Sequence, residues 1–128
     1  MVRKMNMIEI KRIYLSGPMK GIPKYNFPEF HRICKRLRNS GYFVYNPAED
    51  HEGPKGWKFY MQKDIRIMLN LCLDAIVLMP GWKDSEGAEI ELYIAKQLLK
   101  IPAYEYIENS DGFELKELKD IMWSRSIL

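Results

Sequence analysis

The stretch Gly81-Trp82-Lys83-Asp84-Ser85-Glu86-Gly87-Ala88-Glu89-Ile90-Glu91 follows a short apolar run, Ala75 to Met79. It opens a segment with helical periodicity that extends to about Leu99. An apolar strand, a polar loop that contains glycine and the start of a helix, in that order, form a common ligand-binding corner of α/β proteins. The stretch therefore predicts an α/β fold with a site at this corner.

One carboxylate in this stretch is out of place. If the helix begins near Ser85, positions 87, 91, 94, 95 and 98 follow the spacing of a core-facing stripe, and position 91 is Glu91. Helix side chains lean toward the N-terminus, so Glu91 is expected to lie over Gly87, where the missing side chain leaves open space. We also expect the nearby helix N-terminus to keep Glu91 ionised. The alternative is a partly exposed Glu91 paired with Lys83 or Lys96.

The rest of the chain alternates strands with helices. Strands are expected at 11–16, 42–45, 74–79 and 101–107, and helices at 26–39 (capped by Asn26), 57–71 and 113–123. This pattern predicts a single domain over residues 1–128, with a core at about 11–108 and a C-terminal helix at 113–123. The expected architecture is a flavodoxin-like (Rossmann-like) three-layer sandwich with a parallel sheet of four to five strands.

Two irregular loops are expected to meet at one edge of this sheet. In the flavodoxin-like order, strand 11–16 lies beside strand 74–79, and ligands bind at the carboxyl ends of such strands. Those ends carry residues 81–87 and the loop Ser16-Gly17-Pro18-Met19-Lys20-Gly21. Glycines permit close approach of the backbone, while a lysine and a serine at a helix start suit an anion such as phosphate. The candidate binding residues are therefore Ser16, Gly17, Lys20, Gly21, Ser85 and Gly87.

Other residues have a functional and a structural interpretation. Asp64 can reach the crevice and handle a proton, although the pattern alone favours a surface acid paired with Lys63 or Arg66. Tyr14 can hydrogen-bond a carboxylate across the sheet or simply pack. Trp57 and Trp82 flank the crevice and can stack on a base or pack in the core.

Composition narrows the classes of function. The 128 residues have a net charge of +3 and no long basic run, so nucleic acid is not expected as a partner. No apolar run approaches the ~20 residues that span a bilayer, and the N-terminus lacks the apolar region of a signal peptide. Cys34 and Cys72 are expected to be core thiols in a reducing cytoplasm, and no metal site is expected.

Several motifs together resemble the nucleoside 2-deoxyribosyltransferase superfamily, in particular a branch common in phages and bacteria. The similarity covers roughly residues 12–104. Its motifs are Ile13-Tyr14-Leu15-Ser16-Gly17-Pro18-Met19-Lys20-Gly21, Tyr25-Asn26-Phe27-Pro28-Glu29-Phe30, Tyr60-Met61-Gln62-Lys63-Asp64-Ile65, and Asp74 to Trp82 followed by Ser85, Gly87, Ala88 and Glu91.

The resemblance implies an enzyme that cleaves the N-glycosidic bond of a deoxynucleoside or its 5′-monophosphate and transfers the sugar to another base or to water. Glu91 matches the family's nucleophile, Tyr14 a tyrosine that positions it, and Asp64 an acid near the base. Two displacements at one carbon imply net retention of configuration. The resemblance implies no cofactor, and it implies a homodimer or higher homo-oligomer.

Two departures concern the substrate. Typical transferases carry an acid where this chain has Ser85 and an apolar residue where it has Lys20. In nucleotide-cleaving relatives, a serine and a basic residue at these positions bind the 5′-phosphate, so both residues favour a monophosphate. Pro18 argues against this preference, because those relatives have serine there.

Two other classes of function stay open at this level. One is a non-catalytic nucleotide-binding or sensing protein on the same fold. The other is an interaction protein that uses the C-terminal helix and Trp123 as its partner surface.

Overall fold

Within residues 10–123, which are the residues described by this computed structural model, five strands form one sheet in the order β2-β1-β3-β4-β5. The strands β1 (Arg12–Ser16), β2 (Phe43–Tyr45), β3 (Ala75–Leu78) and β4 (Ala103–Asn109) are parallel, while β5 (Gly112–Leu118) runs antiparallel to β4. Ile13 of β1 lies opposite Ala75 of β3, which confirms the predicted neighbours. The N-terminal region used in the signal-peptide argument falls largely outside the described residues.

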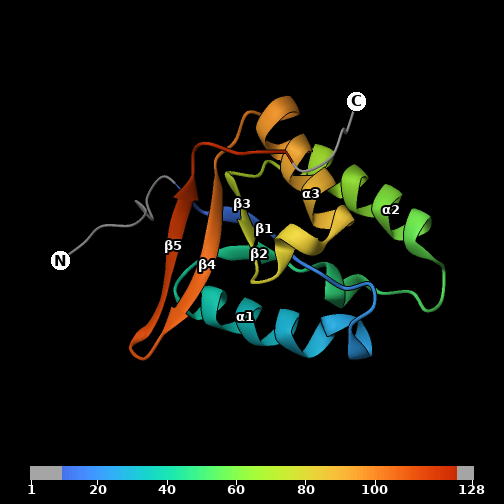
Figure 1. Cartoon of the computed structure of the whole chain (residues 1–128), viewed down its shortest axis with the longest axis horizontal. Helices are drawn as coiled ribbons and strands as arrows, with labels where there is room; N and C mark the ends of the chain where they lie inside the picture. The colour runs from blue at the N-terminus through green and yellow to red at the C-terminus, as the bar shows by residue number, and fades with distance from the viewer. Residues whose placement is uncertain (1–9, 124–128) are drawn as a thin grey trace.

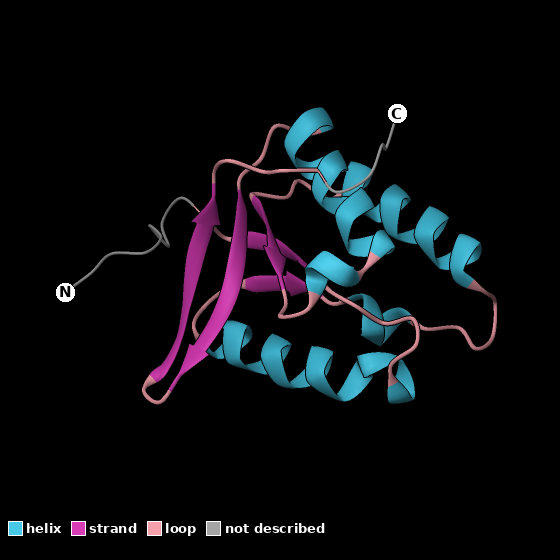
Figure 2. Ribbon diagram, viewed as in Figure 1, coloured by secondary structure: helices cyan, strands magenta, loops and turns pink. Residues whose placement is uncertain are grey.

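Helices cover both faces of the sheet (Figures 1 and 2). Helix α1 (Phe27–Asn39) lies on one face, and α2 (Trp57–Asn70) and α3 (Glu86–Tyr93) lie on the other. A π-helical segment, η4 (Ile94–Leu98), continues α3. Short 3₁₀ turns, η1 (Pro23–Asn26), η2 (Pro47–Asp50) and η3 (Trp82–Asp84), lie in the connections. The α/β class and the helices on both faces are thus as predicted, whereas the sheet is mixed rather than wholly parallel, because β5 pairs antiparallel with β4.

The alternation of side chains along the strands divides the core in two. In β1, Ile13 and Leu15 pack on the α1 side, whereas Tyr14 points to the side of α2 and α3. All four residues of β3 are buried, as expected for a strand covered on both faces. Tyr14 and Ser16 are two positions apart, so β1 presents both to the α2 and α3 side.

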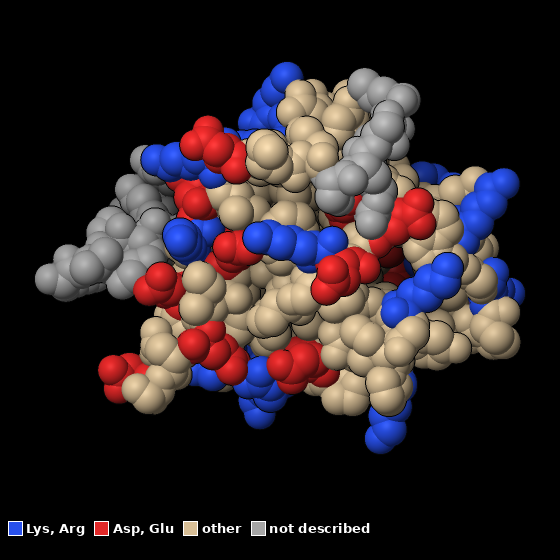
Figure 3. Space-filling model, viewed as in Figure 1, with Lys and Arg blue, Asp and Glu red and all other residues tan. Residues whose placement is uncertain are grey.

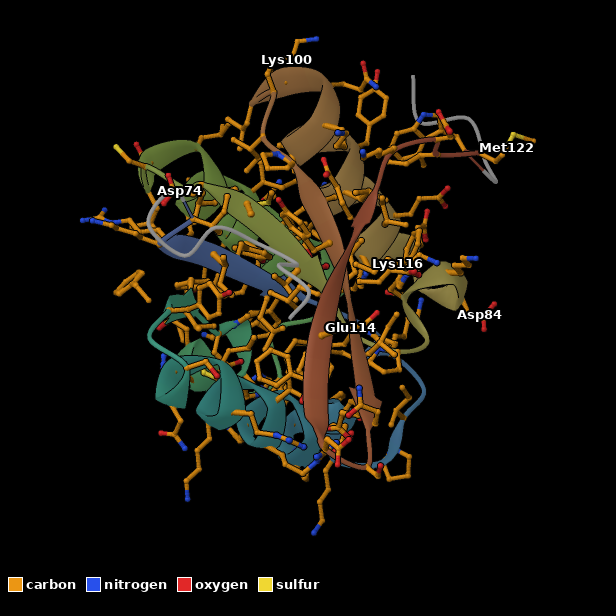
Figure 4. The ribbon with its side chains drawn as sticks, turned by 90° about the vertical axis from the view of Figure 1, so that its left-hand side faces the viewer. Asp74, Asp84, Lys100, Glu114, Lys116 and Met122 are labelled. Carbon is orange, nitrogen blue, oxygen red and sulfur yellow. The ribbon has the colours of Figure 1, made fainter. Side chains whose placement is uncertain are left out.

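The predicted C-terminal helix at 113–123 is wrong, because Gly112–Leu118 is strand β5. The turn at 109–112 returns the chain along β4, and Phe113 stacks on Tyr106 with ring centroids 5.0 Å apart. Leu115 is buried two positions further on, so the relevant period is two rather than 3.6. Figure 4 shows Glu114 and Lys116 on this strand. The interaction surface that required a helix here therefore loses its basis.

Three local predictions also fail. Asn26 makes no capping bond, because its backbone is in the left-handed conformation (φ 62°) and its side chain donates to the carbonyl of Pro18 at 2.9 Å. Leu98 is 62% exposed, since the π-helical segment has more residues per turn and shifts the stripe after residue 93. Cys72 is exposed, while Cys34 is buried as expected.

Candidate functional site

The candidate site lies beyond the carboxyl ends of β1 and β3. Asp74 comes just before β3 and Asp84 lies beyond its carboxyl end. Figure 4 shows these two residues at opposite sides of the molecule, and the site lies on the side of Asp84. The loops that leave the two strands are in close contact. A Cβ atom on Gly17 would lie only 2.9 Å from Cβ of Met79, so glycine is required at this point.

Glu91 is the centre of the site. It is 5% exposed, and it accepts hydrogen bonds from the Tyr14 hydroxyl to Oε2 (2.9 Å) and from the Ser16 hydroxyl to Oε1 (2.7 Å). The alternative of a surface Glu91 paired with a lysine is therefore wrong. Each carboxylate oxygen has its own donor, so the orientation of the carboxylate is fixed by β1.

Asp64 from α2 is a second buried carboxyl group, 9% exposed. Burial raises the pKa of Asp64, an effect opposed in part by the Tyr14 hydroxyl. Burial, and then the charge of Asp64, raise the pKa of Glu91. Since two close carboxylates resist ionising together, the pair retains a proton near neutral pH. The helix N-terminus is therefore not the main influence on Glu91, which is the sixth residue of α3, because burial and the charge of Asp64 raise its pKa.

Both carboxyl groups open onto one cavity of about 250 Å³, here called the first cavity. Of the predicted site residues, it is lined by Gly17, Lys20, Asp64, Ser85, Gly87 and Glu91. The space beside Gly87 is not open as expected. A Cβ atom there would lie 3.1 Å from Sδ of Met61 and 3.5 Å from Nε1 of Trp57, so the glycine makes room for side chains of α2.

The polar residues that line the first cavity carry both signs of charge. Ser85 lies at the predicted start of the helix and caps α3, with Oγ accepting from the Ala88 N–H at 3.1 Å, which leaves its hydroxyl hydrogen free to donate. Lys20 is exposed and forms no ion pair with the described residues. Asp84 and Glu86 line the same cavity and bring negative charge.

Four predicted residues take other places. Tyr14 and Ser16 lie behind Glu91 and hold it. Gly21 and Trp82 do not line the first cavity in the described part of the chain. Trp82 is 8% exposed, and its Nε1 donates to Oε2 of Glu105 on β4 at 2.8 Å. Packing is therefore the correct interpretation of Trp82, whereas Trp57 does line the cavity.

A second cavity, also about 250 Å³, adjoins the first. Lys20, Trp57, Tyr60 and Asp64 line both cavities. Its wall contains three further aromatic side chains that were not among the predicted site residues: Tyr25, Phe27 and His51. Tyr25 and Phe27 lie in the motif at 25–30, whereas His51 follows η2, and no periodicity connects His51 with the other two. The aromatic residues of the 25–30 motif were the available signal.

Three further features concern surface charge, metal-ligating side chains and the length of the helices. On the face shown in Figure 3, acidic and basic side chains are interspersed. Among residues 10–123, no group of three or more histidine, cysteine, aspartate or glutamate residues is placed to hold a metal ion. None of the helices in this part of the chain has the length and apolar character needed to cross a membrane.

Comparison with known proteins places the chain in one family. No curated protein and no solved structure matches the sequence. A family model described as a domain of unknown function, DUF4406, matches residues 11–103. This match extends from the start of β1 to the start of β4 and includes Tyr14, Asp64 and Glu91. The chain therefore belongs to the DUF4406 family.

Proposed function

We propose that this protein cleaves the N-glycosidic bond of a deoxynucleoside or a deoxynucleoside 5′-monophosphate, with Glu91 as the nucleophile. One observation carries the proposal: a buried carboxylate held by two hydroxyl groups faces a cavity next to a second buried carboxyl group. A pure binding site gains little from two carboxyl groups whose burial is unfavourable.

The two carboxyl groups suit different roles. The mechanism places the charge on Glu91, whose charged form the hydrogen bonds from Tyr14 and Ser16 favour, and the shared proton on Asp64. An oxygen of Glu91 attacks the anomeric carbon, the bond from that carbon to the base nitrogen breaks, and its electron pair leaves with the base. Asp64 donates its proton to the departing base.

The second half of the reaction regenerates the enzyme. The glycosyl ester on Glu91 is attacked at the same carbon by water or by a second base. Asp64, now a carboxylate, accepts the proton of the attacking group, and Glu91 leaves as a carboxylate. Two inversions at one carbon give net retention of configuration.

The finer assignments of fold, substrate and assembly belong to the same proposal. The strand order β2-β1-β3-β4-β5 is that of flavodoxin-like proteins, although β5 is antiparallel. Lys20 and Ser85, which both line the first cavity, support a 5′-monophosphate, in line with the resemblance to nucleotide-cleaving relatives. The homo-oligomer rests on the resemblance alone, and the cytoplasmic location rests on the cysteine content alone.

The decisive experiment incubates the protein with each deoxynucleoside and each 5′-monophosphate and follows the free base by chromatography, with and without a second base. The wild type is expected to release or exchange base, and Glu91→Gln is expected to reduce the rate by about a thousandfold or more. Glu117→Gln, a change at an exposed carboxylate of β5, is the matched control and should retain the wild-type rate.

Two outcomes oppose the proposal. If no substrate reacts, while nucleotides bind equally well to the wild type and to Glu91→Gln, the protein is a nucleotide-binding or sensing protein. If base is released at the same rate by Glu91→Gln, the nucleophile is another group. Mass spectrometry of the protein quenched during turnover adds an independent readout, because a glycosyl adduct is expected on Glu91.

A further inference from the structure

The second cavity continues the site in a definite direction. Asp64 lies in the walls of both cavities, whereas Glu91 lines the first alone. A sugar carbon attacked by Glu91 must lie in the first cavity. The group that leaves this carbon and receives a proton from Asp64 therefore extends toward the second.

Aromatic rings form the wall of the second cavity. His51 stacks on Tyr60, with centroids 4.8 Å apart and planes inclined by 13°, and Tyr25 lies over His51 at 5.9 Å. Phe27 meets His51 edge-on at 4.9 Å. Tyr25 and Trp57, which line the cavity, are still 56% and 41% exposed. Exposed aromatic faces in a cavity offer a stacking surface for a flat ring.

Apart from Lys20, His51 and Asp64, the wall of the second cavity offers few polar side chains. The Tyr60 hydroxyl already donates to the carbonyl of Gly53 and accepts from the N–H of Glu52. Met19, Phe27 and Pro54 contribute only apolar side chains. A cavity of this kind recognises a ring by its area more than by the donors and acceptors on its edge.

The backbone that presents Tyr25 is strained. Lys24, Tyr25 and Asn26 have positive φ angles of 56°, 54° and 62°, a left-handed conformation that costs energy in residues with a side chain. The segment is held by the bond from the Asn26 amide to the Pro18 carbonyl and by the bond from Tyr25 N–H to the Ile22 carbonyl, both 2.9 Å. Such strain persists where the surrounding structure holds it, commonly at ligand sites.

We propose that the second cavity binds the heteroaromatic base of the substrate by stacking against Tyr25 and Trp57, and that it does not read the exocyclic groups of the base. This inference rests on the proposed function, since it takes the base as the leaving group. Affinity then follows ring area, so purines bind more tightly than pyrimidines, and bases of one ring size bind alike.

The test measures binding of free bases by calorimetry, which requires no catalysis. Purine, adenine and hypoxanthine should bind the wild type within about threefold of one another, and cytosine more weakly, because stacking strength is nearly independent of edge groups. Tyr25→Ala and Trp57→Ala should each weaken adenine by about tenfold or more. Tyr25→Phe should retain wild-type affinity, and so should Phe43→Ala, a matched loss of an exposed aromatic ring outside both cavities.

A second probe separates local from global effects. Binding of 2-deoxyribose 5-phosphate, which carries no base, should be unchanged in Tyr25→Ala and thereby show that this variant is folded. Equal adenine affinity in the wild type and Tyr25→Ala would overturn the inference, as would a hundredfold difference between adenine and hypoxanthine. If bases bind as expected but no substrate is cleaved, the proposed function fails alone. If substrates are cleaved but base affinity ignores Tyr25, only this inference fails.

Discussion

The hydroxyl of Tyr14 donates a 2.9 Å hydrogen bond to Oε2 of Glu91, which is 77 positions away in the sequence. Tyr14 is itself fixed, because its ring stacks on Tyr45 with centroids 5.4 Å apart. The Tyr45 hydroxyl in turn donates to Oδ2 of Asp50 at 2.9 Å. The carboxylate of Glu91 is therefore oriented by a chain of contacts that runs from β1 through β2 to η2.

Removing this hydroxyl should change the pH profile as well as the rate. In Tyr14→Phe, Glu91 keeps only the bond from Ser16, and we expect kcat to fall by about tenfold to a hundredfold with a smaller change in KM. A bond donated to the charged carboxylate lowers its pKa, so its loss raises the pKa of Glu91. Activity that requires ionised Glu91 should then begin at higher pH, as measured by kcat/KM against pH.

Tyr106→Phe is the matched control for this variant. Tyr106 is also buried in the sheet, and its hydroxyl donates to a carboxylate, Glu108, away from both cavities. It should lose a similar hydrogen bond without a shift of the pH profile. An unshifted profile in Tyr14→Phe would show that Tyr14 contributes to packing alone.

The buried carboxyl pair should make the protein less stable as the pH rises. Because the pKa values of Glu91 and Asp64 are raised in the folded state, the folded protein binds more protons than the unfolded chain above about pH 4. The free energy of unfolding then falls as the pH rises from there through the raised pKa values. Urea unfolding between pH 5 and pH 8 measures this slope.

Glu91→Gln should flatten that slope, since it removes one of the two charges. At pH 8 it should be more stable than the wild type by about 1–3 kcal/mol, with a smaller difference at pH 5. Glu117→Gln should keep the wild-type slope. A wild-type stability that rises with pH over this range would contradict the raised pKa values.

The parallel part of the fold could be predicted from the sequence because its signals are local. Apolar runs bounded by turn residues mark β1 to β4, and Ser85 caps α3 as a serine before a helical period should. The error at 113–123 arose because Phe113, Leu118 and Ile121 fit a helical period. The segment is a strand because it pairs with β4, and this pairing is not visible in the local sequence. Tertiary pairing overrode the local pattern.

The site was predictable in part for the same reason. Glu91 was visible as a charge on an apolar stripe, and strand order brought β1 beside β3. The burial of Asp64 was not visible, because it depends on how α2 packs over the cavity. The position of Trp82 was also not predictable, since its partner Glu105 lies on another strand.

The two glycines of the first cavity should respond differently to alanine. Gly17→Ala places a Cβ atom 2.9 Å from Cβ of Met79, near the backbone, so the two loops must move apart, and we expect a loss of about 1–3 kcal/mol. In Gly87→Ala the new atom meets the mobile end of Met61 at 3.1 Å, while the helix gains about 1 kcal/mol of propensity. Urea unfolding should show a destabilised Gly17→Ala and a nearly unchanged Gly87→Ala. Equal losses would mean that the contact with Met79 is not the constraint.

Ser85→Asp should separate nucleotides from nucleosides. Aspartate caps a helix as well as serine does, so the bond to the Ala88 N–H and the fold should be retained. The new charge repels a phosphate held by Lys20 in the same cavity, and we expect kcat/KM for the 5′-monophosphate to fall by about a hundredfold. The value for the deoxynucleoside should stay within about threefold of the wild type.

Ser85→Asn separates the effect of charge from that of shape, because asparagine also caps but is neutral. Ser85→Asn should lower kcat/KM for the monophosphate far less than Ser85→Asp does. Lys20→Ala should act in the same direction as Ser85→Asp, by about tenfold, through loss of the attracting charge. Equal losses for nucleoside and monophosphate in Ser85→Asp and Lys20→Ala would show that Lys20 and Ser85 do not bind the phosphate. The negative charges of Asp84 and Glu86, which line the same cavity, would then explain why an anion does not bind there.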